Sequence, residues 1–266
     1  MIGGVMGDFI STEFKQTKIK TYNLYHLTSE KSAISSHSLM LAATANALLN
    51  DRDFDESYMQ IGLQHTAIDF DDATEFWLLQ SDINYVQESF ESGAAVRAGV
   101  IGMLDIPISE IHSLAVESAR CTHNSEEAIT SAKVVCSVIN AVRRNASKEE
   151  ITEYLTDFNY DISADYSKLE QSLNCNSNAK NVVLAALYIA FNSENLEESI
   201  RLAIYKFGFN DVNSIITIAS LIKAQSHAVS NYYKVQTQQY LFKNHQSVLQ
   251  IMQEFEHKKW MLELPF

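Results

Sequence analysis

Apolar residues recur every three or four positions along most of the chain after the first 30 residues. The first such stripe consists of Leu39, Ala42, Ala43, Ala47 and Leu48. This spacing places apolar side chains on one face of an α-helix, and short Asn, Ser or Asp breaks separate successive stripes. The pattern predicts no sheet, and it predicts helices at about residues 32–50, 55–67, 107–121, 125–144, 148–157, 179–191, 195–206, 214–228 and 236–258.

Two helix starts carry a recognisable capping pattern. Asn124 precedes Glu127 by three residues, and Ser147 precedes Glu150 by the same spacing. A short polar side chain at such a position accepts a hydrogen bond from a free N–H group, and the Glu side chain accepts one from the backbone N–H of the cap residue. We therefore predict that Asn124 and Ser147 each open a helix.

Residues 69–106 form the least helical segment, and three of the eight glycines, Gly93, Gly99 and Gly102, lie in it. The sequence predicts an irregular region here. Long irregular segments in compact domains are usually functional, so residues 69–106 are a candidate site region.

Composition narrows the fold class. The 266 residues include only 8 Gly and 2 Pro, which leaves almost no material for the turns of a sandwich or barrel. The longest apolar run, Val182 to Phe191, is ten residues, about half of what a bilayer-spanning helix needs. No linker, repeat or change in composition marks a boundary. We predict a single all-α domain, a compact multi-helix bundle over residues 1–266.

Charge and cysteine content limit the partners. The net charge of −13 repels nucleic acid and anionic lipid, so we expect neither as a partner. An acidic chain suits a basic protein face, although plain solubility explains the same charge. Cys121, Cys136 and Cys175 form neither a disulfide framework nor a zinc-ligand spacing. We expect reduced thiols and a soluble, cytoplasmic protein.

Four short polar stretches stand out as candidate chemistry. They are Gly7-Asp8 with Lys15, the run Ser35-Ser36-His37-Ser38, the segment from Gly93 to Arg97, and the run Asn210-Asp211-Val212-Asn213-Ser214. The second and fourth open predicted helices, where free N–H groups and the helix dipole favour anions. Ordinary helix capping accounts for the same residue types, so both interpretations stay open.

Several blocks resemble the ADP-ribosylglycohydrolase family. They are KTYNLYHLTSEKSAISSHSLMLAATANALL, THNSEEAITSAKVVCSVI from Thr122, and EESIRLAIYKFGFNDVNSIITIAS from Glu197. The residues before Arg97 resemble the family segment SFGNGSAMR through Ser89, Phe90, Gly93, Ala95 and Arg97. The resemblance extends to the C-terminal helix. It implies a compact orthogonal all-α fold, two magnesium ions in a cleft, and hydrolysis of the bond between ADP-ribose and a side chain, often arginine.

The family motifs are altered at their functional positions. The motif Thr-Asp-Asp-Thr falls on Ser35 to Ser38, so both carboxylates are missing. The motif Asp-x-Asp-Thr aligns with Asp211 to Ser214, and an ungapped alternative places Phe209, Asp211 and Val212 on the ligand positions. The early block GDxxGSxxE reads GDFISTEFK, which keeps Gly7 and Asp8 but has Lys15 in place of the glutamate.

A pair of magnesium ions requires several carboxylates, and the aligned positions offer too few. We therefore predict that the magnesium ions are lost and that no cofactor replaces them. Ser35 and Ser214 retain hydroxyl oxygens, and the imidazole of His37 suits a softer metal than magnesium. Lys15 either supplies a positive charge to Asp8 or Asp211 through an internal salt bridge, or is a solvated lysine.

The glycine turns of the family are altered as well. The positions read Glu91-Ser92-Gly93 and Phe207-Gly208-Phe209, so we expect bulk and charge in the pocket and a reduced affinity for ADP-ribose. Arg97 and His123 persist. We interpret Arg97 as fixing a loop by hydrogen bonds, and His123 as capping the helix that follows.

These observations predict a catalytically degenerate protein that acts by binding another protein. The expected partner is an ADP-ribosyltransferase toxin, occluded by an immunity or regulatory protein, or an ADP-ribosylated protein. The first alternative is an active divergent hydrolase with an altered metal site built from Asp8, Asp211, Ser214 and His37. A structural or storage role is the second alternative.

Overall fold

The computed structural model describes residues 1–15, 22–79, 89–163, 165–208 and 211–258. Within these ranges the chain forms fourteen α-helices, one short 3₁₀-helix η1 (Thr12–Phe14) and no strand, so the predicted all-α class is confirmed. The helices are α1 (Ile2–Ser11), α2 (Ser36–Asn50), α3 (Phe54–Gln64), α4 (Asp72–Leu79), α5 (Gly93–Ile101), α6 (Ile108–Arg120), α7 (Glu126–Arg143), α8 (Lys148–Thr156), α9 (Tyr166–Cys175), α10 (Ala179–Phe191), α11 (Leu196–Phe207), α12 (Val212–Lys223), α13 (Asn231–Asn244) and α14 (Gln246–His257).

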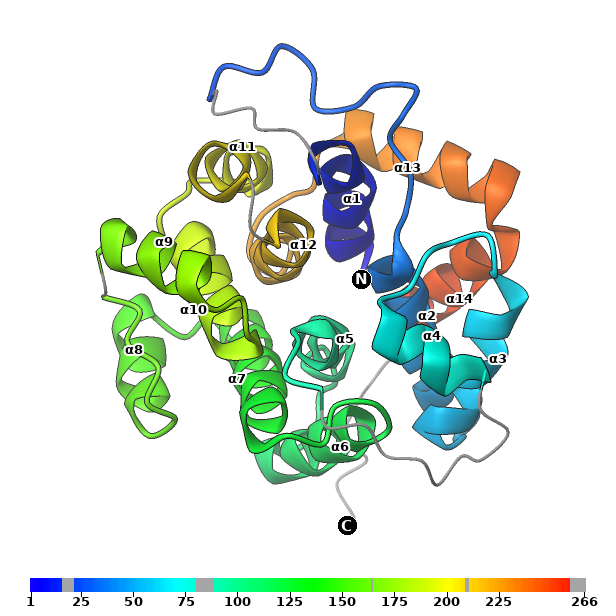
Figure 1. Ribbon diagram of the computed structural model, residues 1–266, viewed down its shortest axis with the longest axis horizontal. Helices are drawn as coiled ribbons and strands as arrows, with labels where there is room; N and C mark the ends of the chain where they lie inside the picture. Colours follow the sequence, from blue (N-terminus) through cyan, green and yellow to red (C-terminus); the bar gives the residue numbers. More distant parts are fainter. Residues whose placement is uncertain (16–21, 80–88, 164, 209–210, 259–266) are drawn as a thin grey trace.

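Three helices form the centre of the molecule. Every residue of α1 and of α12 is buried, and so are residues 94–101 of α5. Figure 1 shows these three helices in the middle, with the other helices packed around them. A helix that is buried on all sides shows no amphipathic stripe, because every face meets protein.

Helix α1 was not predicted, and its glycines explain why. Gly is a poor helix former, by about 1 kcal/mol relative to Ala. In the fold, however, a Cβ at Gly3 would lie 2.3 Å from the Cβ of Ala224, and one at Gly7 would lie 2.5 Å from the Oγ of Ser220. The glycines therefore let α1 and α12 approach more closely than side chains would permit, and this packing outweighs the poor propensity.

The prediction of an irregular region at residues 69–106 is wrong for much of its length. The segment contains α4 and α5, and α5 lies in the core. A Cβ at Gly102 would lie 2.5 Å from the carbonyl oxygen of Cys136 in α7. Two of the glycines that indicated a loop, Gly99 and Gly102, instead allow close packing on α7, since a Cβ at Gly99 would lie 3.1 Å from the Cδ1 of Ile139. Residues 80–88 of the segment lie outside the described ranges.

The remaining helix predictions differ from the structure at their ends and at one break. The predicted helix 236–258 is two helices, α13 and α14, separated at His245. Helix α9 was not predicted. The long run Val182–Phe191 lies in α10, and no described helix is long and apolar enough to cross a membrane.

Local capping signals were accurate in one case and displaced in the other. The Ser147 hydroxyl accepts from the Glu150 N–H at 3.2 Å, and the Glu150 carboxylate accepts from the Ser147 N–H at 2.8 Å, so this capping box is confirmed. Helix α7 is instead capped by Ser125, whose hydroxyl accepts from the Ala128 N–H. The prediction for Asn124 was one residue early.

Candidate functional site

A cleft of about 590 Å³ opens where the first turns of three helices meet. Ser36 and His37 belong to α2, Gly93 begins α5, and Val212 to Ser214 begin α12. The lining residues are Lys15, Ser36, His37, Met40, Asp69, Phe70, Asp71, Thr74, Glu91, Ser92, Gly93, Arg97, His123, Ser177, Asp211, Val212, Asn213 and Ser214.

All ten positions singled out from the sequence gather at this cleft. Two of them, Asp8 and Ser35, are buried directly behind its wall, joined to each other by hydrogen bonds. The other eight line it: Lys15, Ser36, His37, Gly93, Arg97, Asp211, Asn213 and Ser214.

Asp8 is fully buried in α1 and binds the start of α2. Its Oδ2 accepts from the N–H groups of Ser35 and Ser38, at 2.8 and 3.1 Å. The hydroxyls of the same two serines donate to Oδ1 and Oδ2, each at 2.5 Å. Asp8 therefore provides acceptors for the free N–H groups at the N-terminus of α2. Its negative charge also interacts favourably with the positive end of the helix dipole.

Asn213 extends this hydrogen-bond network to α12. Its side-chain amide donates to the Ser35 hydroxyl at 3.2 Å, and its carbonyl oxygen accepts from the Ser11 hydroxyl at 2.9 Å. The Thr217 hydroxyl donates to the same carbonyl oxygen at 3.3 Å. Both ends of the Asn213 amide are thus engaged, and the network joins α1, α2 and α12.

His37 and Ser214 meet across the cleft wall. The His37 Nε2 lies 2.8 Å from the Ser214 hydroxyl oxygen. Burial lowers the pKa of His37, and the charge of Lys15 lowers it further, while Asp8 and Asp71 oppose the shift. The imidazole is therefore neutral at pH 7, with Nε2 occupied by a hydroxyl.

Of the two alternatives for Lys15, the internal salt bridge does not form: within the described ranges no ion pair joins Lys15 to Asp8 or Asp211. Lys15 is exposed at the edge of the cleft, so the solvated interpretation holds.

Asp211 is the N-cap residue of α12, and its backbone lies in the left-handed region, with φ 46°. Its carboxylate accepts a hydrogen bond from the Ser177 hydroxyl. Burial raises the pKa of Asp211, and Lys15 acts against this shift through its charge.

Arg97 holds a loop in place, as interpreted from the sequence. Its buried guanidinium donates to the Ser118 carbonyl at 2.7 Å and to the Thr122 hydroxyl at 2.8 Å. It also lies over the ring of Tyr58, 4.6 Å from the centroid, in a cation–π contact. These bonds fix the end of α6 against α5.

His123 does not cap a helix, because Ser125 does so. Its Nδ1 lies 2.7 Å from the Thr122 hydroxyl, and a Cβ at Gly93 would lie 3.1 Å from its Nε2. Burial lowers the pKa of His123 far below its usual value, and the charges of Arg97 and His37 add to this shift. His123 is therefore a neutral side chain at the cleft wall, and the absence of a Cβ at Gly93 makes room for its ring.

The expected filling of the cleft by phenylalanine is wrong for Phe207. This side chain is buried in the core, with its ring 5.5 Å from that of Tyr166. It does not line the cleft, and Phe209 lies outside the described ranges. Glu91 does line the cleft, so the expected negative charge is present while the space stays open.

Sequence reasoning missed the part of the site before α4. Asp69, Asp71 and Thr74 line the cleft opposite the α12 end, and Asp71 Oδ1 accepts from the Thr74 N–H at 2.8 Å. Ser177 was missed as well. The acidic run Asp69 to Asp72 before an apolar stretch is a helix-start signal that could have placed α4.

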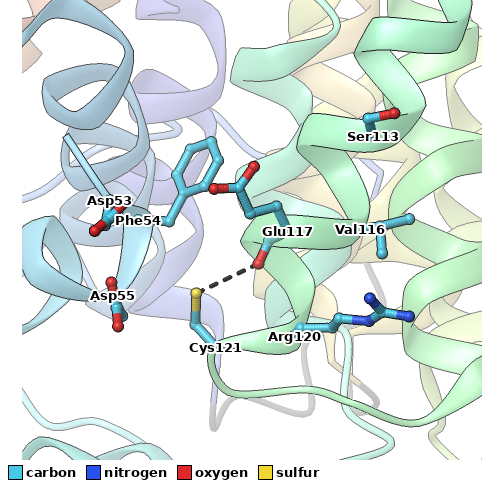
Figure 2. A pocket seen from close by; sticks show the side chains of 8 residues that line it. All are labelled: Asp53, Phe54, Asp55, Ser113, Val116, Glu117, Arg120 and Cys121. Atoms are coloured by element: carbon cyan, nitrogen blue, oxygen red, sulfur yellow. Dashed lines mark hydrogen bonds between the residues drawn. The ribbon is translucent and has the colours of Figure 1, made fainter. Parts of the chain in front are cut away.

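A second cavity, of about 640 Å³, lies away from this cleft between the start of α3 and α6 (Figure 2). Asp53 and Asp55 face Glu117 and Arg120 across it. The Cys121 thiol donates to the backbone carbonyl of Glu117 at 3.4 Å. Burial raises the pKa of Cys121 to about 11, so the sulfur stays protonated and unreactive.

Comparisons with known proteins support the all-α fold described above. The family model for ADP-ribosylglycohydrolase matches residues 1–221. A solved structure of an ADP-ribosylglycohydrolase-related protein complex is similar at a TM-score of 0.63 and 16% identity, over 96% of this chain and 94% of that one. No curated protein matches the sequence. At this identity the structural likeness shows the fold alone.

Proposed function

Because this chain belongs to the ADP-ribosylglycohydrolase family, we propose that it is a catalytically degenerate member that acts by binding a protein. One observation carries the proposal. The buried carboxylate of Asp8 accepts four hydrogen bonds from the start of α2, three at Oδ2 and one at Oδ1, so most of its accepting capacity is used by the fold.

The other side chains in the cleft do not fit the two magnesium ions of the family. Magnesium requires near-octahedral oxygen ligands at about 2.0–2.1 Å. His37 offers a nitrogen, and the amide oxygen of Asn213 already accepts two hydrogen bonds. Across the described ranges, no three His, Cys, Asp or Glu side chains are grouped so as to hold a metal ion. This mismatch supports a protein that does not perform the family reaction.

A hydrogen-bond network holds three helices together beside the cleft. Asp8, Ser35 and Asn213 connect α1, α2 and α12 without an ion. Each polar side-chain atom of these three residues has a hydrogen-bond partner, as buried polar groups in a stable fold require. This supports retention of the scaffold for a purpose other than catalysis.

The proposed partner is an ADP-ribosyltransferase toxin or an ADP-ribosylated protein. The basis is the family's association with ADP-ribosylation together with the open, acidic cleft, whose exposed rim includes Asp69, Asp71 and Glu91. A rim of this sign suits a basic protein surface. An immunity or regulatory protein of this kind would act by occluding the partner's active cleft.

Isothermal titration with ADP-ribose, with magnesium present and with EDTA, tests the loss of the metal pair. We expect no magnesium-dependent binding by the wild type. A variant with carboxylates restored at the aligned positions is the matched comparison and should gain magnesium affinity; it combines Lys15→Glu, Ser36→Asp, His37→Asp and Asn213→Asp. Magnesium-dependent release of ADP-ribose from a modified protein by the wild type would contradict the proposal.

Binding to a partner needs a separate assay. The wild type should inhibit an ADP-ribosyltransferase encoded next to its gene at stoichiometric concentrations, without removing ADP-ribose from the products. Charge reversal at Asp69 and Asp71 should weaken the inhibition, because both carboxylates lie on the cleft rim. Inhibition that requires turnover of ADP-ribosylated product would instead indicate an enzyme.

The second candidate function is a divergent hydrolase. The observation in its favour is that the cleft remains open, with a neutral His37 beside the Ser214 hydroxyl. Such an enzyme, with an altered metal site that includes His37, would release ADP-ribose without EDTA and would lose this activity in EDTA and on His37→Gln. The degenerate-protein proposal expects no release under either condition.

A further inference from the structure

Two histidines from distant parts of the sequence meet at the end of α3. His65 is the C-terminal cap of α3, and His245 lies at the break between α13 and α14. Their Nδ1 atoms are 3.2 Å apart, and their ring centroids are 5.2 Å apart. Both side chains are half-buried, so the pair is ordered by packing and still open to solvent.

The protonation of this pair follows from its neighbours. The His65 Nε2 lies 3.3 Å from the Ser247 hydroxyl. Donation from Nε2–H to this hydroxyl leaves a lone pair on Nδ1, which faces the Nδ1 of His245. Burial lowers the pKa of both histidines, and the neighbouring His65 lowers that of His245 further. At neutral pH two uncharged imidazoles therefore point nitrogen atoms at one another.

We propose that His65 and His245 bind a divalent transition-metal ion of the zinc, copper or nickel class. Imidazole nitrogen prefers these ions. Two nitrogens 3.2 Å apart, each at the usual zinc distance of about 2.05 Å, subtend about 103° at the metal, close to the tetrahedral angle of about 109°. The ion takes the place of the shared proton, and His245 changes to its Nε2–H tautomer.

Ser247 supports the site from behind. Histidine ligands of metal ions commonly donate their other N–H group to an oxygen, which fixes the tautomer and the ring orientation. The Ser247 hydroxyl occupies this position for His65. Solvent completes the coordination, and the ion ties the end of α3 to the junction of α13 and α14.

This site is separate from the cleft and does not depend on the function proposed above. In the cleft the Nε2 of His37 already contacts the Ser214 hydroxyl, and the Nδ1 of His123 contacts that of Thr122. In the His65–His245 pair, by contrast, the two Nδ1 atoms face each other directly at 3.2 Å, so both can serve as ligands of one ion.

Equilibrium dialysis of the full chain against zinc at neutral pH tests the proposal, with His65→Gln, His245→Gln and His26→Gln as variants. His26 is an exposed histidine and serves as the matched control. The wild type and His26→Gln should bind one zinc ion with equal affinity, and each of the other two variants should lose at least about tenfold. Ser247→Ala should weaken binding by about 10–100-fold.

A second measurement separates binding from folding. Circular dichroism of each variant without metal should match the wild type, and cobalt titration should give a visible absorption band that His65→Gln and His245→Gln abolish. No saturable zinc binding by the wild type would overturn the proposal. Zinc binding that survives both glutamine substitutions would overturn it as well, and loss on His37→Gln alone would place the ion in the cleft instead.

Discussion

The role assigned to Asp8 predicts a large loss of stability on Asp8→Asn, a substitution that preserves the shape of the side chain. The carboxylate accepts four hydrogen bonds, two from backbone N–H groups and two from hydroxyls. An amide retains one accepting oxygen and directs its NH₂ group at donors. With that oxygen in the place of Oδ2, three of the bonds remain and the Ser35 hydroxyl loses its acceptor at Oδ1. The lost bond and the lost charge behind the other three together cost about 1–3 kcal/mol.

Urea unfolding followed by circular dichroism measures this loss. Asp211→Asn is the matched control, since Asp211 caps a helix in the left-handed conformation, which Asn adopts well. We expect the control to change the free energy of unfolding by less than about 0.5 kcal/mol. The contrast isolates the buried hydrogen bonds of Asp8 from the general effect of removing a carboxylate.

The same titrations with magnesium and with EDTA test the reasoning behind the prediction. If Asp8 serves only the fold, the stability lost on Asp8→Asn is the same under both conditions. A metal ligand would behave differently, since magnesium would stabilise the wild type and not the variant. A magnesium-dependent difference, or a variant as stable as the wild type, would refute the role assigned to Asp8.

Three further changes should alter stability for separate reasons. Gly3→Ala should cost about 1–3 kcal/mol in urea unfolding, because its Cβ would lie 2.3 Å from that of Ala224; a neutral result would show that α1 can move. Ser147→Ala should cost about 1 kcal/mol by the same assay through loss of the capping box, and no change would show that the cap is dispensable. His123 has a folded-state pKa far below 6.5, so the unfolded chain binds more protons and stability falls as pH drops below 6.5; His123→Gln should flatten this dependence.

Local signals in the sequence were sufficient where a helix has one apolar face and a polar cap. Ser147 and Glu150 lie three residues apart, so their mutual hydrogen bonds can be anticipated from the sequence alone. The helices missed in the centre differ in kind. Gly3, Gly7 and Gly102 have poor helix propensity, and the contacts that compensate come from α12 and α7, which are remote in sequence.

The candidate site was also only partly predictable, because its contacts join residues that are remote in sequence. Its positions could be brought together from the sequence because motif order indicated which segments converge. The direction in which each side chain points could not be predicted from the sequence. Lys15 was one candidate for an internal salt bridge and is exposed, whereas Asp8 is already engaged by the N–H groups at the positive N-terminal end of α2. A bond between residues 27 to 30 positions apart leaves no periodic signal in the sequence.

By the motif resemblance, neutral polar groups stand in place of carboxylates at two helix starts, those of α2 and α12. A cleft that keeps Asp8 but carries His37 and Asn213 in place of acidic residues has less negative charge to offset, so on the function proposed above we expect it to fold without a cation. Both replacements are engaged, His37 with Ser214 and Asn213 with Ser35. Restoring a single carboxylate would bury an unpaired charge and break one of these bonds, whereas restoring several recreates a site that needs metal to fold well. The substitutions therefore act as a set, and a stepwise return to metal binding should pass through less stable intermediates.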